Sequence, residues 1–210
     1  MSLWPDVPSS IFGPDRRFPF SDAHVGYVLR QREDVYAYRE GYKQGAIALA
    51  ELVHARNGSP ALLVWPIAWL WRHWLELALK ETIATGIQLD VGDDGWRWPT
   101  RLGHRLGDLW QAARPHIEPH GDPMAPELSN VTAIVSELDS LDPEGTGFRY
   151  PHARDGSSSL PSAPEHLNVG RFDETMQRVA AFLDAVRECQ RSVLESLREQ
   201  AREAYEQSQW

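Results

Sequence analysis

The fold is decided by residues 66–86, which read PIAWLWRHWLELALKETIATG. Proline is favoured in the first turn of a helix, as at Pro66, and glycine just after the last turn, as at Gly86. Apolar residues recur between them at the period of one helical face, and further leucines widen that face over most of the circumference. The face consists of Ile67, Leu70, Trp71, Trp74 and Ala78. The segment therefore predicts a helix at the centre of a bundle.

Four other segments have helical patterns, and together they predict an all-α fold. We expect helices over about 22–56 with a break at Gly41, from about His104 with a weakening at Pro115, over 126–141 and over 171–206. The segments 87–103 and 142–170 contain many Gly, Pro and polar residues and predict irregular structure. Residues 61–65 resemble a short strand, but the sequence offers that strand no obvious partner.

The last predicted helix carries a heptad pattern, with spacings of four and three sustained over more than three heptads. Its positions are Phe172, Met176, Val179, Leu183, Val186, Gln190, Val193 and Leu197. About 35 residues of helix are roughly 50 Å long, which is more than a small bundle covers. We therefore expect a homodimer with Val193 and Leu197 at the contact.

The 210 residues suffice for one domain with an extension. Residues 1–21 are rich in proline and predict an extended N-terminal arm, and residues 22–210 predict a single helical domain. One cysteine excludes an intramolecular disulfide. No leader sequence and no membrane-spanning apolar run is evident, so we expect a cytoplasmic protein without a membrane segment.

The net charge of −9 predicts that the whole molecule repels nucleic acid at long range. A polyanion site would therefore require a local concentration of positive charge. The chain has no glycine-rich phosphate loop, no H-E-x-x-H and no G-x-S-x-G. His116 and His120 have the spacing of metal ligands, but prolines at 115 and 119 argue against a regular helical face there. We expect neither a metal nor a cofactor.

A stripe of polar residues crosses the apolar central helix. Arg72, His73, Glu76 and Lys80 fall on one side of it, with Trp69 in their middle. The stripe has two interpretations. It is either a salt-bridged surface, as on many helices, or a site with more basic groups than its one carboxylate neutralises.

Two further runs contain chemically useful residues. Gly103-His104 opens the next predicted helix, where His104 is either a helix-start residue or part of a site. The run Gly147-Phe-Arg149-Tyr150-Pro lies in the irregular segment 142–170. Its stiff aromatic and proline residues either direct Arg149 at a target or only attach the loop to the bundle.

These three runs, R-H-x-L-E-L-x-L-K, G-H-x-L-x-x-L-W and F-R-Y-P, resemble a HEPN (higher eukaryotes and prokaryotes nucleotide-binding) domain over roughly residues 42–190. The closest likeness is to uncharacterised bacterial members with an arginine–histidine pair on the second helix. The resemblance implies a helical bundle that is usually dimeric and belongs to toxin–antitoxin or antiviral defence systems. It also implies a protein partner from the same system and, in many members, metal-independent ribonuclease activity.

Ribonucleases of this family carry an arginine and a histidine separated by four to six residues. The chain has three such pairs, Arg17 with His24, Arg97 with His104 and Arg114 with His120. Chance gives about two in a chain with this content of arginine and histidine, so the motif does not select a catalytic pair.

We expect the domain to engage RNA or a nucleotide through the polar stripe. Arg72, Lys80 and Arg149 would bind the phosphate and stabilise its developing charge. His73 or His104 would move the proton, because histidine titrates near neutral pH. Glu76 would orient the basic groups. Trp69 and Tyr150 would contact the substrate.

A different class of function is also open. The chain could be a non-catalytic interaction module, either antitoxin-like or a scaffold subunit, that binds a partner protein through apolar grooves. Nine tryptophans favour this alternative, because several lie outside the predicted core. Those are Trp4, Trp96, Trp98 and Trp210.

Overall fold

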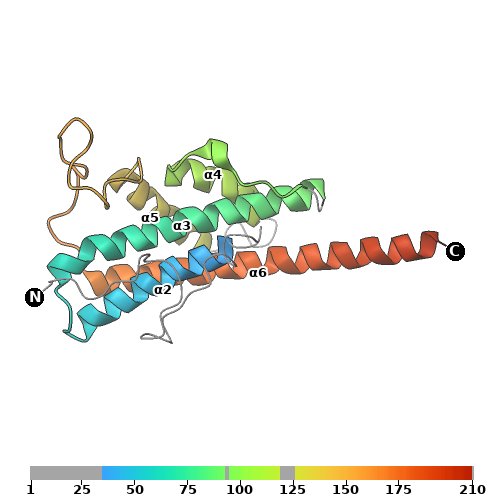
Figure 1. Ribbon diagram of the computed structural model, residues 1–210, viewed down its shortest axis with the longest axis horizontal. Helices are drawn as coiled ribbons and strands as arrows, with labels where there is room; N and C mark the ends of the chain where they lie inside the picture. The colour runs from blue at the N-terminus through green and yellow to red at the C-terminus, as the bar shows by residue number, and fades with distance from the viewer. Residues whose placement is uncertain (1–34, 93–94, 119–125, 210) are drawn as a thin grey trace, which may run out of the picture. The chain divides into compact units, whose positions relative to one another are not determined.

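The structure, a computed structural model, describes residues 35–92, 95–118 and 126–209 (Figure 1). Within these ranges it contains five α-helices and no strand, apart from an isolated antiparallel bridge between His152 and Ser158. The helices are α2 (Val35–His54), α3 (Pro60–Val91), α4 (Leu106–Ile117), α5 (Pro126–Leu141) and α6 (Val169–Ser208), and a 3-10 turn η2 (Thr100–Leu102) precedes α4. The all-α prediction is confirmed. The predicted arm, residues 1–21, lies outside the described residues.

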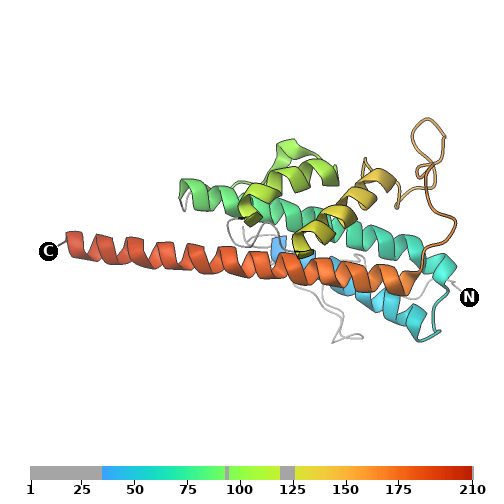
Figure 2. The same cartoon turned by 180° about the vertical axis from the view of Figure 1, so that it is seen from behind.

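Helix α3 is the centre of the bundle, as its apolar circumference predicts. Helices α4 and α6 both pack against α3, and α5 packs against α4 (Figure 2). Trp71, Trp74 and Leu75 of α3 are completely buried. The indole Nε1 of Trp71 donates a hydrogen bond of 2.8 Å to Asp173 on α6, which links the two longest helices inside the core.

Helix α3 is longer at both ends than the sequence predicts. It begins at Pro60 and runs through Pro66, so the strand-like residues 61–65, for which the sequence offers no partner strand, are helical. Pro66 removes one hydrogen bond to a carbonyl in the preceding turn, but that turn is exposed and water can satisfy the carbonyl. Gly86 lies inside the helix, which ends at Gly92 with a φ of 95°.

The other helices match their predicted positions to different degrees. Helix α5 has the predicted bounds, and α2 runs through Gly41 without the predicted break. Helix α4 begins at Leu106 and contains Pro115. His104 therefore lies in the turn between η2 and α4 and is not the first residue of the helix. The segment between α5 and α6 is irregular, as predicted.

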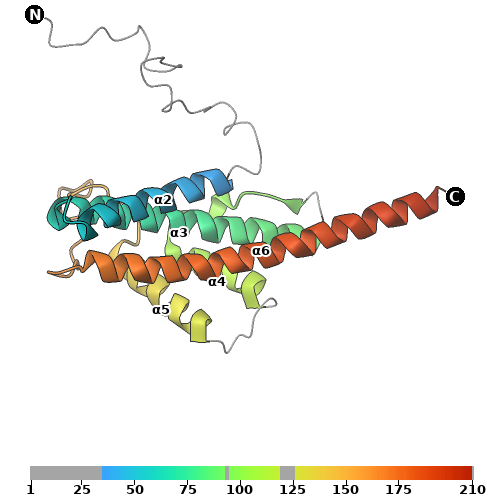
Figure 3. The same ribbon diagram turned by 90° about the horizontal axis from the view of Figure 1, so that it is seen from below.

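Helix α6 runs antiparallel to α2 and continues past the end of α3 (Figure 3). It begins where the Asn168 side chain accepts a hydrogen bond of 2.9 Å from the Arg171 amide, a typical N-cap. The heptad positions from Met176 to Gln190 are buried, whereas Val193 and Leu197 are exposed. The homodimer contact at those two residues stays a prediction.

No helix among the described residues combines the length and the apolar character needed to cross a membrane.

Candidate functional site

The polar stripe of α3 is not a solvated surface, because its charged groups are buried. The side chains of Arg72, Glu76 and Lys80 are 2%, 4% and 8% exposed. Glu76 accepts from both cations, since its Oε2 lies 3.0 Å from Arg72 Nη1 and its Oε1 lies 2.9 Å from Lys80 Nζ. Both ion pairs follow from the local sequence, because residues at positions i and i+4 lie next to each other on one face of a helix.

His104 joins this arrangement from the turn before α4. Its Nδ1 lies 2.7 Å from Glu76 Oε1, and its carbonyl oxygen accepts a hydrogen bond of 2.6 Å from Arg72 Nη2. The His104 side chain is nevertheless 67% exposed. Buried charges on α3 thus hold both the backbone and the ring of a histidine that faces solvent.

Asp142, at the end of α5, supplies a second buried carboxylate. Its Oδ2 lies 3.2 Å from Arg72 Nε, an ion pair whose angle is too poor for a hydrogen bond. Its Oδ1 accepts from the amides of Thr146 and Gly147 at 2.9 and 2.8 Å. Asp142 therefore ties the loop that follows α5 to the central helix.

We call this group of interacting charged residues the Glu76 cluster. It consists of Arg72, Glu76, Lys80, His104 and Asp142. The local sequence of α3 contains only one carboxylate among these basic residues, from which an excess of positive charge is inferred. That inference is wrong for the buried groups, because the two carboxylates balance the charges of Arg72 and Lys80. Burial alone would raise the pKa of Glu76, but hydrogen bonds and charge from Lys80 and His104 outweigh it and hold the pKa below its usual 4.5.

His73 lies beside the cluster in an aromatic setting. Its ring meets the Tyr42 ring edge-on at 4.5 Å and stacks on Trp69 at 5.8 Å. Burial is the main cause that lowers the pKa of His73 below its usual 6.5, and the charges of Arg72, Arg149 and Lys80 lower it further against the opposing charge of Glu76. His73 therefore tends to be neutral at physiological pH.

Arg149 and Tyr150 lie on the exposed side of the loop after α5. The Arg149 guanidinium lies 5.4 Å from the centre of the Tyr150 ring, and both residues are exposed. Within the described part of the chain, Arg149 makes no ion pair. It is therefore a cation available to an anionic ligand, unlike Lys80, whose ammonium binds Glu76.

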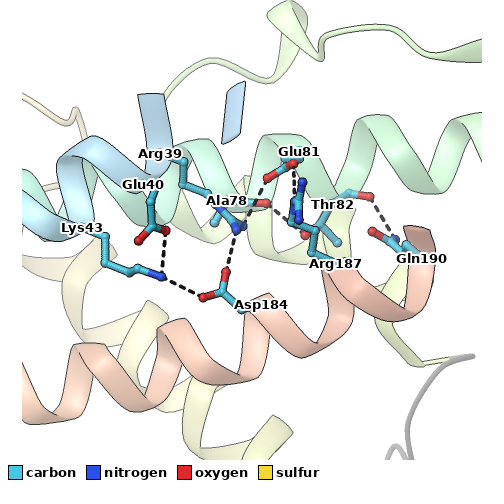
Figure 4. Close-up of polar contacts among 9 residues, drawn as sticks. All are labelled: Arg39, Glu40, Lys43, Ala78, Glu81, Thr82, Asp184, Arg187 and Gln190. Carbon is cyan, nitrogen blue, oxygen red and sulfur yellow. Dashed lines mark hydrogen bonds and ion pairs between the residues drawn. The ribbon is translucent and has the colours of Figure 1, made fainter. Parts of the chain in front are cut away.

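A second group of charges, which we call the Asp184 cluster, links α2, α3 and α6 (Figure 4). Arg39 is buried and lies 2.5 Å from Asp184 Oδ1 and 3.2 Å from Glu81 Oε2. Lys43 binds the other Asp184 oxygen at 3.0 Å, and Arg187 binds Glu81 at 2.9 Å. Each of these cations has a carboxylate partner, so the Asp184 cluster is typical of a structural link between helices. Unlike the Glu76 cluster, it holds no exposed histidine such as His104 at the surface.

The described residues contain no group of three or more His, Cys, Asp or Glu arranged to hold a metal ion. His116 lies on α4 against Gly86, where a Cβ would come within 2.5 Å of the imidazole. His120, its predicted neighbour in a metal pair, is outside the described residues.

Asp142, Gly145 and Tyr42 also belong to this region, although no motif in the sequence marks them as functional. Asp142 and Gly145 belong to the run Asp142-Pro-Glu-Gly-Thr-Gly147, whose composition signals a turn but not its partner. Gly145 has a φ of 72°, and a Cβ there would lie 2.8 to 2.9 Å from the Arg72 guanidinium. The close approach of the turn to Arg72 therefore requires glycine.

No protein-family model matches this chain, and no curated protein and no solved structure matches it either. The resemblance to HEPN domains therefore rests on the three sequence runs alone.

Proposed function

We propose that the chain is a HEPN-like protein of a bacterial defence or toxin–antitoxin system that binds RNA or a nucleotide, with His104 as its proton-transfer group. One observation carries the proposal: the exposed His104 ring is held at 2.7 Å by the buried Glu76 carboxylate. Burying several charges is costly, and an apolar core would stabilise a fold as well. Here the buried charges orient a surface imidazole, as a catalytic or binding role requires.

The hydrogen bond determines which nitrogen of His104 can react. Glu76 receives donors on both oxygens and is ionised, so it can only accept, and Nδ1 of His104 must carry the proton that it donates. In the neutral ring, Nε2 then keeps its lone pair. A base in this position can take the proton of a ribose 2′-hydroxyl and later return a proton to the departing 5′-oxygen.

Arg149 supplies the complementary charge in this proposal. It is exposed and unpaired within the described residues, and a phosphodiester is an anion suited to its planar fork. Arg72 and Glu76 act as positioning residues, because they are buried and contact His104 rather than solvent. Lys80 holds Glu76 from the other side and is too buried to reach a phosphate directly without rearrangement.

The test compares wild type with His104→Gln and Arg149→Ala. Purified protein is incubated with total RNA in the presence and absence of EDTA, and binding to a labelled RNA is measured beside cleavage. We expect cleavage to resist EDTA and to fall by at least about a hundredfold in His104→Gln, the usual contribution of a general base. His166→Ala removes another exposed histidine and is the matched control.

The results separate catalysis from binding. Arg149→Ala should lose RNA binding without a change in melting temperature, since its side chain is exposed. Wild-type protein that binds RNA but does not cleave it would limit the proposal to binding. RNA binding that is the same in wild type and Arg149→Ala would contradict the proposed site.

A second function is favoured by the end of α6. Val193, Leu197 and Tyr205 are exposed on a helix that continues past α3, which suits a protein-binding module or a homodimer (Figure 3). Salt distinguishes the two functions. Phosphate binding weakens steeply as salt rises, whereas an apolar protein interface does not.

A further inference from the structure

Three flat rings follow one another on α3, at Trp65, Trp69 and His73, each four residues from the next. Trp69 and His73 stack almost in parallel, with 8° between their planes. Trp65 stacks instead on Phe148 of the loop after α5, with 6.3 Å between ring centres and 23° between planes. The row thus joins the His73 environment to the base of the loop that carries Arg149.

Trp65 differs from its neighbours because it is 42% exposed, whereas Phe148 beneath it is buried. An exposed indole offers a large flat apolar face to a ligand or a partner, which is why tryptophan is enriched at interfaces. An aliphatic side chain would shield Phe148 equally well. Trp65 therefore presents a flat ring to solvent on top of Phe148, the residue that precedes Arg149 in the loop, and Arg149 makes no ion pair within the described residues.

The support beneath Trp65 is rigid. Asp142 binds the amides of Thr146 and Gly147 directly before Phe148, and Arg72 binds Asp142 from α3. A Cβ on Gly147 would lie 2.4 Å from the Leu160 side chain, so the loop is closely packed at this point. Phe148 is thus positioned before any ligand arrives, which lowers the entropy cost of binding on Trp65.

We infer that Trp65, supported by Phe148, is a stacking platform for one nucleobase of single-stranded RNA whose phosphate binds Arg149. This inference rests on the proposed function and adds a base-binding residue to it. Every nucleobase has a flat face that can stack on an indole, and the adjacent residue in the loop, Arg149, provides a cation for the neighbouring phosphate. A paired base cannot reach such a platform, so the site selects unpaired RNA.

The test uses two probes that share a backbone and differ in their bases. One is an octamer of 2′-O-methyluridine, which cannot be cleaved through its 2′-oxygen, and the other is an abasic octamer of the same backbone. Their length is about that bound by one small single-strand-binding domain. Dissociation constants are measured by fluorescence anisotropy for the full chain and for its Trp65→Ala, Trp65→Phe and Arg149→Ala variants.

We expect Trp65→Ala to weaken binding of the uridine octamer about tenfold and to leave the abasic octamer unchanged. Trp65→Phe keeps a ring and should retain most of the affinity. Arg149→Ala should weaken both probes, because both carry phosphates. Tyr38→Ala, which removes another exposed aromatic residue on α2, is the matched control and should change neither.

Equal effects of Trp65→Ala on both probes, or no effect on either, would overturn the platform while leaving phosphate binding intact. Failure of the wild-type chain to bind either octamer would contradict the proposed function itself, and the platform with it. If Trp65→Ala does not fold, Trp65→Leu replaces it. Leucine still covers Phe148 but offers no flat ring, so the same tenfold loss is expected.

Discussion

Replacing Arg72 with alanine should destabilise the protein strongly, because it leaves two buried carboxylates without their shared cation. Glu76 and Asp142 are 4% and 2% exposed, and Arg72 contacts both. Removing one partner of a buried ion pair typically costs about 3–5 kcal/mol. Glu76 keeps Lys80 and His104, and Asp142 keeps two backbone amides, so we expect the low end of that range.

A loss of about 3 kcal/mol in a domain of this size lowers the melting temperature by roughly 6–12 °C. Thermal and urea unfolding at pH 7, followed by circular dichroism, measure both quantities. The matched control is Arg178→Ala, which removes an exposed i,i+4 pair with Glu174 on α6. That variant should change stability by less than about 0.5 kcal/mol.

The comparison between these variants tests the buried network directly. If Arg72→Ala costs no more than Arg178→Ala, Arg72 does not hold the carboxylates, and the reasoning from burial fails. A large loss would also mean that Arg72→Ala cannot report on RNA binding alone. For that reason Arg149 and His104, both exposed, carry the functional tests.

Three further predictions concern the conformation of Gly145, the pKa of His73 and the exposed end of α6. Gly145→Ala should destabilise the protein by about 1–3 kcal/mol, because its φ of 72° is unfavourable for alanine and its Cβ would meet Arg72; unchanged urea midpoints would contradict this. Since burial lowers the folded-state pKa of His73 below 6.5, the unfolded chain binds more protons in mildly acidic solution, so stability should fall as pH drops below about 6.5. His73→Gln should show a weaker pH dependence in urea unfolding between about pH 5 and 7, and identical slopes would refute the assignment. Light scattering should give a dimer that Leu197→Glu converts to the 23.8 kDa monomer, and a wild-type monomer at high micromolar concentration would exclude the α6 contact.

Local sequence determined the helices, because helical periodicity and end signals act within a few residues of each other. The bounds of α5 follow from its pattern, and the central position of α3 follows from its apolar circumference. The bounds of α3 could not be predicted so well. Proline is a weak marker of a helix start when water can satisfy the carbonyl that it leaves free, as in the exposed turn before Pro66.

The pairing of Arg72 with Glu76 was also local, since the two residues lie one helical turn apart. The apolar residues around the stripe indicate that this pair is at least partly buried, and the structure buries it almost completely. The sequence could not show that His104, 28 residues from Glu76, lies against it. Asp142, which is 70 residues from Arg72, balances the charge that the local stripe left in excess. These groups meet only because α3 packs against α4 and against the loop after α5. Ion pairs between residues that are distant in the chain depend on such tertiary contacts, and helical periodicity in the sequence does not reveal them.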